Sequence, residues 1–317
     1  MAGTDQVSSP TVSVILPVFD RLGFLRAAVA SVFAQTLTDW ELVIADDGSN
    51  EQTRAYLAEL ARQPRIRVVW LAHTGNPAAA RNAALQEATG EFVAFLDSDD
   101  EWLPEKLATQ VAALRDQPQR LWCYSPVLHI DAHGSPLMRK PNRRRKPPVG
   151  ATFERIARWE AAIAMPSVIA QRQLVERVNR FDERQKMHED CDLWLKLAQQ
   201  SEVNFIDKPL SRVRHHTSHY SATGEQALRD WLALFEKWQA QVIEPAHKRL
   251  FRRQRARSTT RLARYYAAKG DATSAFTTIA GSVGLWNCAE WWSGSAIALA
   301  RLVVPSKIVN AWRGYLG

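Results

Sequence analysis

Short apolar runs alternate with amphipathic stretches along residues 11–110. A β-branched run over 12–18 predicts a buried strand. Five apolar residues then recur at helical spacing, namely Leu22, Leu25, Val29, Val32 and Phe33. Further strands are predicted at 41–45, 66–70 and 91–96, with helices at 51–62 and 78–88 between them. This order predicts an α/β fold, in which a mainly parallel sheet carries helices on both faces.

The rest of the chain shows two other patterns. Residues 111–222 are less regular, with strands predicted at 121–124, 127–130 and 204–206 and a short helix at 190–200. Within them, the run 139–146 holds six basic residues, which predicts an exposed, mobile loop. Residues 223–317 are helical by pattern, carry six of the 12 tryptophans, and contain one stretch similar to a tetratricopeptide-type hairpin. We expect a disordered N-terminus (1–10), one domain over 11–222 with halves 11–110 and 111–222, and a helical region over 223–317.

Composition is that of an ordinary globular protein, with 46% hydrophobic and 23% charged residues among 317. The net charge of +8 and the pI of about 9.6 suit a polyanionic partner, which could be a nucleoside diphosphate, an anionic membrane surface or a nucleic acid. Three distant cysteines support neither a disulfide framework nor a thiolate zinc site and favour a reducing, cytoplasmic setting. We find no secretory signal pattern and no apolar run long enough to span a bilayer.

The strongest chemical motif follows the strand predicted at 91–96. Asp97, Asp99 and Asp100 stand together there, and buried carboxylates repel one another unless a cation lies among them. Oxygen ligands favour Mg²⁺ or Mn²⁺, with phosphate oxygens and water completing the coordination shell. The alternative is an acidic turn in which Asp100 caps the next helix.

Three further segments carry candidate chemistry. Asp47 lies in an Asp-Asp-Gly-Ser turn after the second strand, where a carboxylate can bind a base or a ribose hydroxyl, although Asp-Gly also favours a simple turn. Arg81, on the helix before the acidic strand, can offer a planar fork to a diphosphate, or can simply be a surface residue. Glu189 and Asp190 open a helix, where they either complement its dipole or supply a general base.

Taken in order, these segments resemble the inverting glycosyltransferases of family two, which have the GT-A fold. The resemblance rests on residues 12–19, 35–36, 40–49, 80–84, 90–100 and 189–195 and covers residues 11–222. It implies a nucleotide-binding half (11–110) and an acceptor-binding half (111–222). It also implies that Mg²⁺ or Mn²⁺ is the cofactor and that a nucleotide sugar, by analogy a uridine diphosphate sugar, is the donor.

The resemblance also implies a role for each matching residue. Pro17, Phe19 and Asp47 would surround the nucleoside, Asp97, Asp99 and Asp100 would bind the metal with Asp97 also near the donor, and Asp190 would be the catalytic base supported by Glu189. Arg214, His216 and Ser221 would belong to a loop that folds over the diphosphate. Val213 stands where the family has a tyrosine, which leaves the register of that loop open. A three-histidine metal site in the same segment is the alternative.

The helical region and the remaining alternatives concern partners. Eight basic residues between Lys248 and Arg264, followed by Trp286, Trp291 and Trp292, favour contact with the inner leaflet of the cytoplasmic membrane; a helical cap or a dimer interface is the alternative. The acceptor would be a glycan or a lipid-linked sugar in surface polysaccharide, lipopolysaccharide or other glycan synthesis. A dehydrogenase or phosphate-loop fingerprint is missing from the first turn. A glycoside hydrolase, a catalytically silent scaffold and a nucleic-acid-binding protein remain as alternatives, although the aromatic residues are not interleaved with the basic ones.

Overall fold

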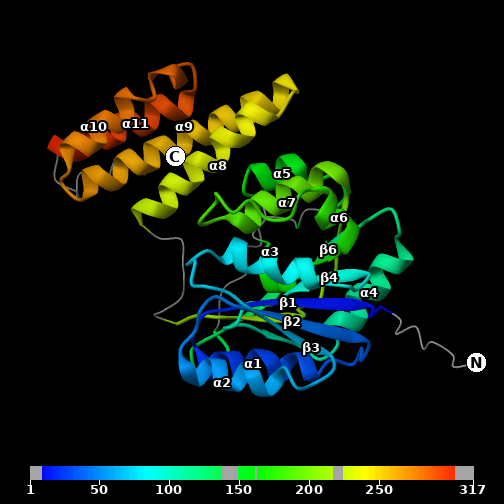
Figure 1. The fold of residues 1–317 in the computed structure, drawn as a ribbon. Helices are drawn as coiled ribbons and strands as arrows, with labels where there is room; N and C mark the ends of the chain where they lie inside the picture. Colours follow the sequence, from blue (N-terminus) through cyan, green and yellow to red (C-terminus); the bar gives the residue numbers. More distant parts are fainter. Residues whose placement is uncertain (1–8, 138–146, 148, 161–162, 217–223, 304–317) are drawn as a thin grey trace, which may run out of the picture. The chain divides into compact units, whose positions relative to one another are not determined.

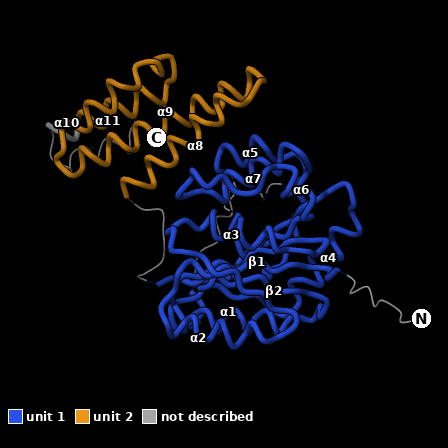
Figure 2. The backbone as a smooth tube through the Cα atoms, viewed as in Figure 1, with its two compact units in different colours: residues 1–219 blue, residues 220–317 orange. Residues whose placement is uncertain are grey.

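The computed structural model describes residues 9–137, 147, 149–160, 163–216 and 224–303. The chain divides into two compact units, residues 1–219 and 220–317, which are coloured separately in Figure 2. The expectations for residues 1–8, for the basic run 139–146 and for Ser221 lie outside the described residues.

The first unit is an α/β domain (Figure 1). Its strands are β1 (Val12–Val18), β2 (Trp40–Asp46), β3 (Ile66–Trp70), β4 (Phe92–Phe95), β5 (Glu101–Trp102), β6 (Trp122–Tyr124), β7 (Val127–Ile130), β8 (Ile169–Gln171), β9 (Val203–Phe205) and β10 (Ser211–Arg214). Its helices are α1 (Leu22–Phe33), α2 (Glu51–Leu60), α3 (Pro77–Glu87), α4 (Lys106–Asp116), α5 (Phe153–Ala157), η1 (Met165–Ser167), α6 (Arg172–Arg177) and α7 (Glu189–Gln200).

Seven strands form the central sheet in the order β3-β2-β1-β4-β8-β6-β9. Strands β3, β2, β1 and β4 are parallel to one another, and β6 is parallel to β9. Strand β8 is antiparallel to both β4 and β6. The predicted α/β fold with a mainly parallel sheet is therefore confirmed.

Helices cover both faces of the sheet, so its strands are apolar on both sides. Helices α1, α2 and α4 pack on one face, in a single apolar cluster with alternate residues of β1 such as Val12, Val14 and Leu16. Helix α3 packs over β1 and β2, on the side opposite α1 and α2 in Figure 1. Because helices cover both faces of the sheet, a ligand can reach the strands only at the edge formed by their carboxyl ends, and the polar side chains lie there.

A second, three-stranded sheet has the order β5-β10-β7. Strand β10 is antiparallel to β5 and parallel to β7, so residues 211–214 are held beside residues 101–102 and 127–130. The polar pattern of β5 and β10 carried no strand signal, and neither strand was predicted. The small sheet thus brings β10, near the end of the domain, back beside the segment from Asp97 to Asp100, which we call the acidic segment.

The second unit is helical. It consists of α8 (Glu225–Gln241), α9 (Pro245–Ala268), α10 (Ala272–Ala280), η2 (Val283–Leu285) and α11 (Ala289–Val303). Helix α9 packs against α8, α10 and α11, and its contact with α11 is close because Gly294 meets the side chain of Thr260. Within the described part of the chain, no helix is both long and apolar enough to cross a membrane.

Candidate active site

Three loops meet at the carboxyl ends of β2, β1 and β4, which are neighbours in the sheet. They contain Phe19 to Arg21, Asp46 to Ser49 and Asp97 to Asp100. The first two loops are tied together, because Ser49 Oγ accepts the N–H of Asp20 at 2.8 Å and Asp20 Oδ1 accepts the N–H of Asn50 at 2.7 Å. Parallel pairing thus collects residues that the chain keeps far apart.

Asp47 is buried and fixed by the loop that follows β3. Its Oδ1 accepts the N–H and the hydroxyl of Thr74, both at 2.8 Å, and its Oδ2 accepts the N–H of Gly75 at 2.9 Å. Beside it, the half-exposed ring of Phe19 stacks on His73, with ring centroids 4.1 Å apart. Pro17 lies half-buried in β1. Asp47, Phe19 and His73 therefore line one end of the edge; His73 was not predicted, since nothing in its sequence neighbourhood marks it.

Arg81 connects the acidic segment to the start of α7. Its Nη2 donates to Asp97 Oδ1 and its Nη1 to Glu189 Oε1, each at 2.6 Å, and the residue is only 5% exposed. Burial lowers the pKa of Arg81, but the charges of Asp97 and Glu189 outweigh burial and raise it overall. The surface alternative for Arg81 is therefore excluded, and its guanidinium is a bridge between two carboxylates.

The acidic neighbours of Asp97 change the pKa of its carboxyl group. Burial raises the pKa of Asp97, Arg81 lowers it, and the charges of Asp99 and Asp190 raise it further. Burial likewise raises the pKa of Glu189, which Arg81 lowers and Asp190 raises. Such coupling requires the carboxylates to be near one another. The end of β4 and the start of α7 therefore share one electrostatic environment.

Asp99 is held by two basic side chains from different loops. Arg21 Nη1 lies 2.8 Å from Asp99 Oδ2, and His216 Nε2 lies 3.0 Å from the same oxygen. The ring of His216 packs on Phe24, with centroids 4.7 Å apart. Arg21 was not predicted, because a basic residue between a strand and a helix is an ordinary surface pattern.

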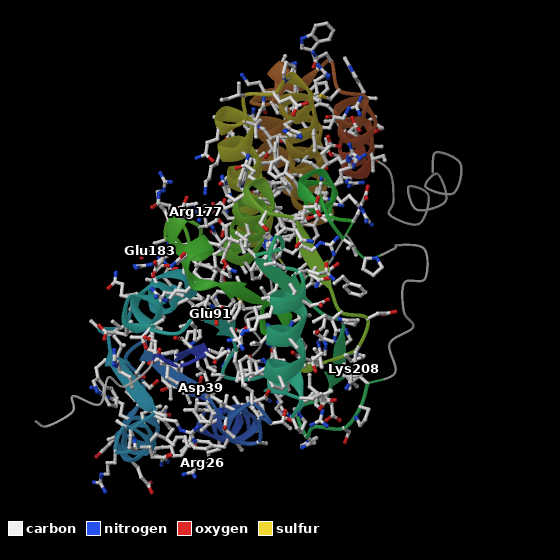
Figure 3. The ribbon with its side chains drawn as sticks, turned by 90° about the vertical axis from the view of Figure 1, so that its right-hand side faces the viewer. Arg26, Asp39, Glu91, Arg177, Glu183 and Lys208 are labelled. Atoms are coloured by element: carbon white, nitrogen blue, oxygen red, sulfur yellow. The ribbon has the colours of Figure 1, made fainter. Side chains whose placement is uncertain are left out.

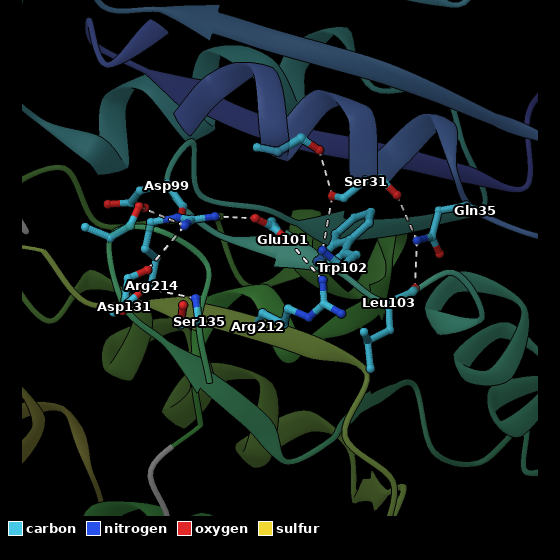
Figure 4. A network of polar contacts seen from close by, with 12 residues as sticks. Ser31, Gln35, Asp99, Glu101, Trp102, Leu103, Asp131, Ser135, Arg212 and Arg214 are labelled. Atoms are coloured by element: carbon cyan, nitrogen blue, oxygen red, sulfur yellow. Dashed lines mark hydrogen bonds and ion pairs between the residues drawn. The ribbon is translucent and has the colours of Figure 1, made fainter. Parts of the chain in front are cut away.

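Arg214 makes a second set of contacts with the acidic segment, among them one with Asp99 (Figure 4). Asp100 Oδ1 accepts the backbone N–H of Arg214 at 2.8 Å, and Arg214 Nε donates to the carbonyl of Asp99 at 2.9 Å. The same guanidinium contacts the side chain of Glu101 and the carbonyls of Asp131 and Ala132. Arg214 thus fixes the acidic segment to the small sheet.

The pKa of Asp100 is raised well above its usual value by burial and by the charges of Asp97 and Asp99. Asp100 does not cap the following helix: α4 begins at Lys106, and Glu101–Trp102 is strand β5. The acidic segment is therefore a place where three carboxylates oppose one another, not a helix cap.

Asp190 lies in the first turn of α7 and is partly exposed. Its Oδ1 accepts the N–H of Cys191 at 2.7 Å. The residue before the helix, His188, has a left-handed backbone (φ 63°), which turns the chain into α7. Asp190 therefore stands beside Glu189, close enough to Asp97 to raise its pKa.

Within the described ranges, no three His, Cys, Asp or Glu side chains are arranged to hold an ion on their own. His215 and His216 have different partners, since His215 Nε2 lies 2.9 Å from His129 Nδ1 while His216 contacts Asp99, and His219 is outside the described residues. Mg²⁺ and Mn²⁺ need only one or two protein carboxylates when a diphosphate supplies further oxygens, and Asp97, Asp99 and Asp100 fit that requirement.

A separate shallow groove of about 610 Å³ lies beside α2 and the end of β3. It is lined by Ser49, Glu51, Arg54, Ala55, Ala58 and Trp70. None of the predicted site residues lines it, so the groove and the acidic segment are different features.

Several curated proteins are similar to this chain. An uncharacterized glycosyltransferase of Rickettsia felis is 32% identical over 203 residues, which are 64% of this chain and 33% of that protein. The UDP-Glc:alpha-D-GlcNAc-diphosphoundecaprenol beta-1,3-glucosyltransferase WfgD of Escherichia coli is 39% identical over 103 residues, 32% of this chain and 40% of that protein. The chain spans about a third of the length of the first Rickettsia relatives that it matches.

Solved structures share the fold. S. aureus TarS 1–349 in complex with UDP superposes with a TM-score of 0.63 at 20% identity, covering 91% of this chain and 90% of that one. The mannosyltransferase PcManGT from Pyrobaculum calidifontis, in complex with GDP-Man and Mn²⁺, gives 0.59 at 18% identity, covering 97% and 84%. The predicted GT-A fold is confirmed.

A family model described as Glycosyl transferase family 2 matches residues 13–202. That range contains the loops at the ends of β1, β2 and β4, the bridge made by Arg81, and the first turn of α7. The resemblance seen in the sequence is confirmed, and this chain belongs to glycosyl transferase family 2.

Proposed function

We propose that this glycosyltransferase moves a sugar with inversion from a nucleoside diphosphate, in the first instance a UDP-sugar, to the hydroxyl of a glycan or lipid-linked acceptor in cell-surface polysaccharide synthesis. One observation carries the proposal: Arg81 pairs at 2.6 Å with both Asp97, at the end of β4, and Glu189, which precedes Asp190 on α7, so the two acidic segments lie at one place. WfgD, by its name a UDP-glucose transferase, and TarS bound to UDP support the donor class.

The nucleoside would lie between Phe19 and Asp47. The exposed ring of Phe19 offers a stacking surface, and Asp47 is held by three hydrogen bonds from residues 74 and 75. A carboxylate fixed in this way has a defined orientation toward a base N–H or a ribose hydroxyl. Both residues lie at the carboxyl edge of the sheet, where ligands of such folds bind.

A divalent cation would be held by Asp99, with Asp97 and Asp100 beside it. The charge of Asp99 raises the pKa of Asp97, and the charges of Asp97 and Asp99 raise the pKa of Asp100; a cation among them would remove this repulsion. The Mn²⁺ in the PcManGT complex supports a cation of this kind. When bound, it would neutralise the diphosphate and make it a better leaving group.

Asp190 would act as the catalytic base. The acceptor oxygen attacks the anomeric carbon as the bond from that carbon to the diphosphate oxygen breaks, and the acceptor proton passes to the Asp190 carboxylate. Arg81 would keep Glu189 ionised and in place beside it, because each group pairs with the other at 2.6 Å. Attack from the face opposite the leaving group gives inversion at the anomeric carbon.

Calorimetric titration with UDP, with and without Mn²⁺, tests these assignments. We expect Asp99→Asn to weaken metal-dependent binding by at least tenfold while Asp190→Asn binds UDP normally and loses turnover. Donor hydrolysis over a panel of nucleotide sugars would then identify the base and sugar. Normal Mn²⁺-dependent binding in Asp99→Asn would contradict the ligand assignment.

We further propose that the second unit contacts an anionic inner-leaflet surface while the protein stays on the cytoplasmic side. Phe276, Trp286 and Trp292 are about 60% exposed, and α9 carries exposed basic residues such as Arg249 and Arg253. Aromatic rings beside basic side chains suit the headgroup region. Flotation of the full chain with phosphatidylglycerol vesicles tests this: Trp286→Ser with Trp292→Ser should reduce flotation, and unchanged flotation would refute it.

A further inference from the structure

The loop after β1 places one basic side chain on the acidic segment. Asp20 and Arg21 are both left-handed, with φ of 57° and 60°, a conformation that costs a non-glycine residue about 1 kcal/mol. Hydrogen bonds to Ser49 and Asn50 hold Asp20 in this conformation. As a result, Arg21 leaves the loop toward β4, and its Nη1 reaches Asp99 Oδ2 at 2.8 Å.

Among the described residues, three arginines contact the segment from Asp97 to Asp100, and their side chains differ in exposure. The side chains of Arg81 and Arg214 are 6% and 5% exposed, and each is held by several groups. The side chain of Arg21 is 29% exposed, although the Asp99 side chain it pairs with is only 9% exposed. Arg21 is therefore the one of these three that can leave its carboxylate for solvent or ligand without a large desolvation change.

The geometry points to Arg21 as a place-holding cation, which neutralises Asp99 before the donor arrives and pairs with the donor's diphosphate afterwards. This role rests on the proposed function, since it needs a divalent cation at Asp99 and a nucleoside diphosphate beside it. His216 shares Asp99 Oδ2 and packs on Phe24, so one contact to Asp99 remains when Arg21 departs.

The place-holding role of Arg21 predicts opposite effects on two equilibria, the binding of a divalent cation alone and the binding of the nucleotide. A divalent cation entering alone meets the like charge of Arg21, which opposes it across a few ångströms. A diphosphate entering afterwards gains the guanidinium as an additional partner, because guanidinium groups pair well with phosphate oxygens. Removing the charge of Arg21 should therefore strengthen binding of the metal alone and weaken binding of the nucleotide.

The experiment uses the full chain with Mn²⁺ alone, followed by electron paramagnetic resonance of free Mn²⁺, and then UDP at saturating Mn²⁺, followed by calorimetry. We expect Arg21→Gln to bind Mn²⁺ about five- to tenfold more tightly and UDP about tenfold more weakly. Arg21→Lys keeps the charge and should leave Mn²⁺ binding as in the parent. Arg26→Gln removes a charge from an exposed residue of α1, the helix that follows Arg21 (Figure 3); its guanidinium lies over Tyr56, and the change should alter neither affinity.

The outcomes separate this role from the proposed function. If the parent protein binds UDP without any effect of Mn²⁺, the proposed metal site fails and the role of Arg21 fails with it. If the parent shows Mn²⁺-dependent binding and Arg21→Gln weakens Mn²⁺ binding or leaves it unchanged, only the place-holding role is overturned. A merely structural Arg21 would reduce both affinities together and would do so in Arg21→Lys as well.

Discussion

Lys106 gives the most quantitative prediction, because it is an ionisable group with no exposed surface. It is the first residue of α4, and its Nζ donates to Gln110 Oε1 at 2.6 Å and lies 4.2 Å from the centre of the Trp102 ring. Burial lowers the pKa of Lys106 to about 7. We expect Lys106→Met to remove a large part of the rise in stability between pH 7 and pH 9.

The magnitude follows from the two protonation states. In the unfolded chain the amine has its ordinary pKa of about 10.4, so it keeps its proton throughout this interval, whereas the folded protein loses it as the pH rises past 7. Stability rises with pH wherever the unfolded state binds more protons. Integrating the difference from pH 7 to pH 9 gives about 2 kcal/mol in favour of the folded state.

Urea denaturation at pH 7, 8 and 9, followed by circular dichroism, measures this contribution. The unfolding free energy of the parent minus that of Lys106→Met should increase by about 2 kcal/mol over the interval. Burial raises the pKa of the neighbouring Cys123 thiol to about 12, and its contribution cancels because both proteins contain it. Lys208→Met removes an exposed lysine (Figure 3), 2.8 Å from Glu105, and should leave the slope unchanged.

A pH-independent difference between the parent and Lys106→Met would refute the reasoning. It would mean that Lys106 keeps its charge in the folded protein, stabilised by Trp102 and Gln110. A slope that changes equally in Lys208→Met would show that net charge, rather than the burial of one amine, controls the effect.

Three other substitutions test particular contacts. Gly48 has a φ of +78°, and Gly48→Ala places a Cβ 2.9 Å from the backbone nitrogen of His73. We expect urea denaturation to show a loss of about 1–3 kcal/mol in the free energy of unfolding, together with weaker UDP binding; an unchanged protein would show that the loop adjusts freely. Arg81→Met leaves Asp97 and Glu189 without their shared partner, so the free energy of unfolding should fall by about 3–5 kcal/mol at pH 7. The loss should be smaller at pH 4, where both carboxylates take protons, and an equal loss at both pH values would contradict the ion-pair explanation. Gly294→Ala puts a Cβ 2.3 Å from Thr260 Cβ and should lower the unfolding temperature. If packing is the cause, adding Thr260→Ala to the same protein should recover most of the lost temperature.

The pattern of apolar runs was sufficient for the first half of the main sheet. Strands β1 to β4 alternate with helices and are buried on both faces, so periodicity and order identify them. Strand β8 has only three residues, and its antiparallel place between β4 and β6 depends on pairing with distant segments. Short strands of this kind carry little signal of their own, which is why β5, β8 and β10 were not predicted.

The candidate site was predicted by residue type but not by pairing. Asp47, Asp97, Asp99 and Asp190 follow from strand ends and a helix start, which sequence reveals. That Arg81 joins Asp97 to Glu189, or that Arg21 reaches Asp99, depends on loop geometry that no residue spacing encodes. The roles of these residues stay predictions until the binding experiments are done.

The bridge made by Arg81 has a consequence for synthesis on the ribosome. Its two carboxylate partners differ greatly in sequence distance, since Asp97 is 16 residues away and Glu189 is 108 residues away. A nascent chain that has released the first four strands can bury Arg81 with only half of its counter-charge. We therefore expect the N-terminal strands to remain loosely packed during translation until α7 emerges. Fragments released from arrested ribosomes should accordingly resist protease less when they end before residue 189 than when they end after α7.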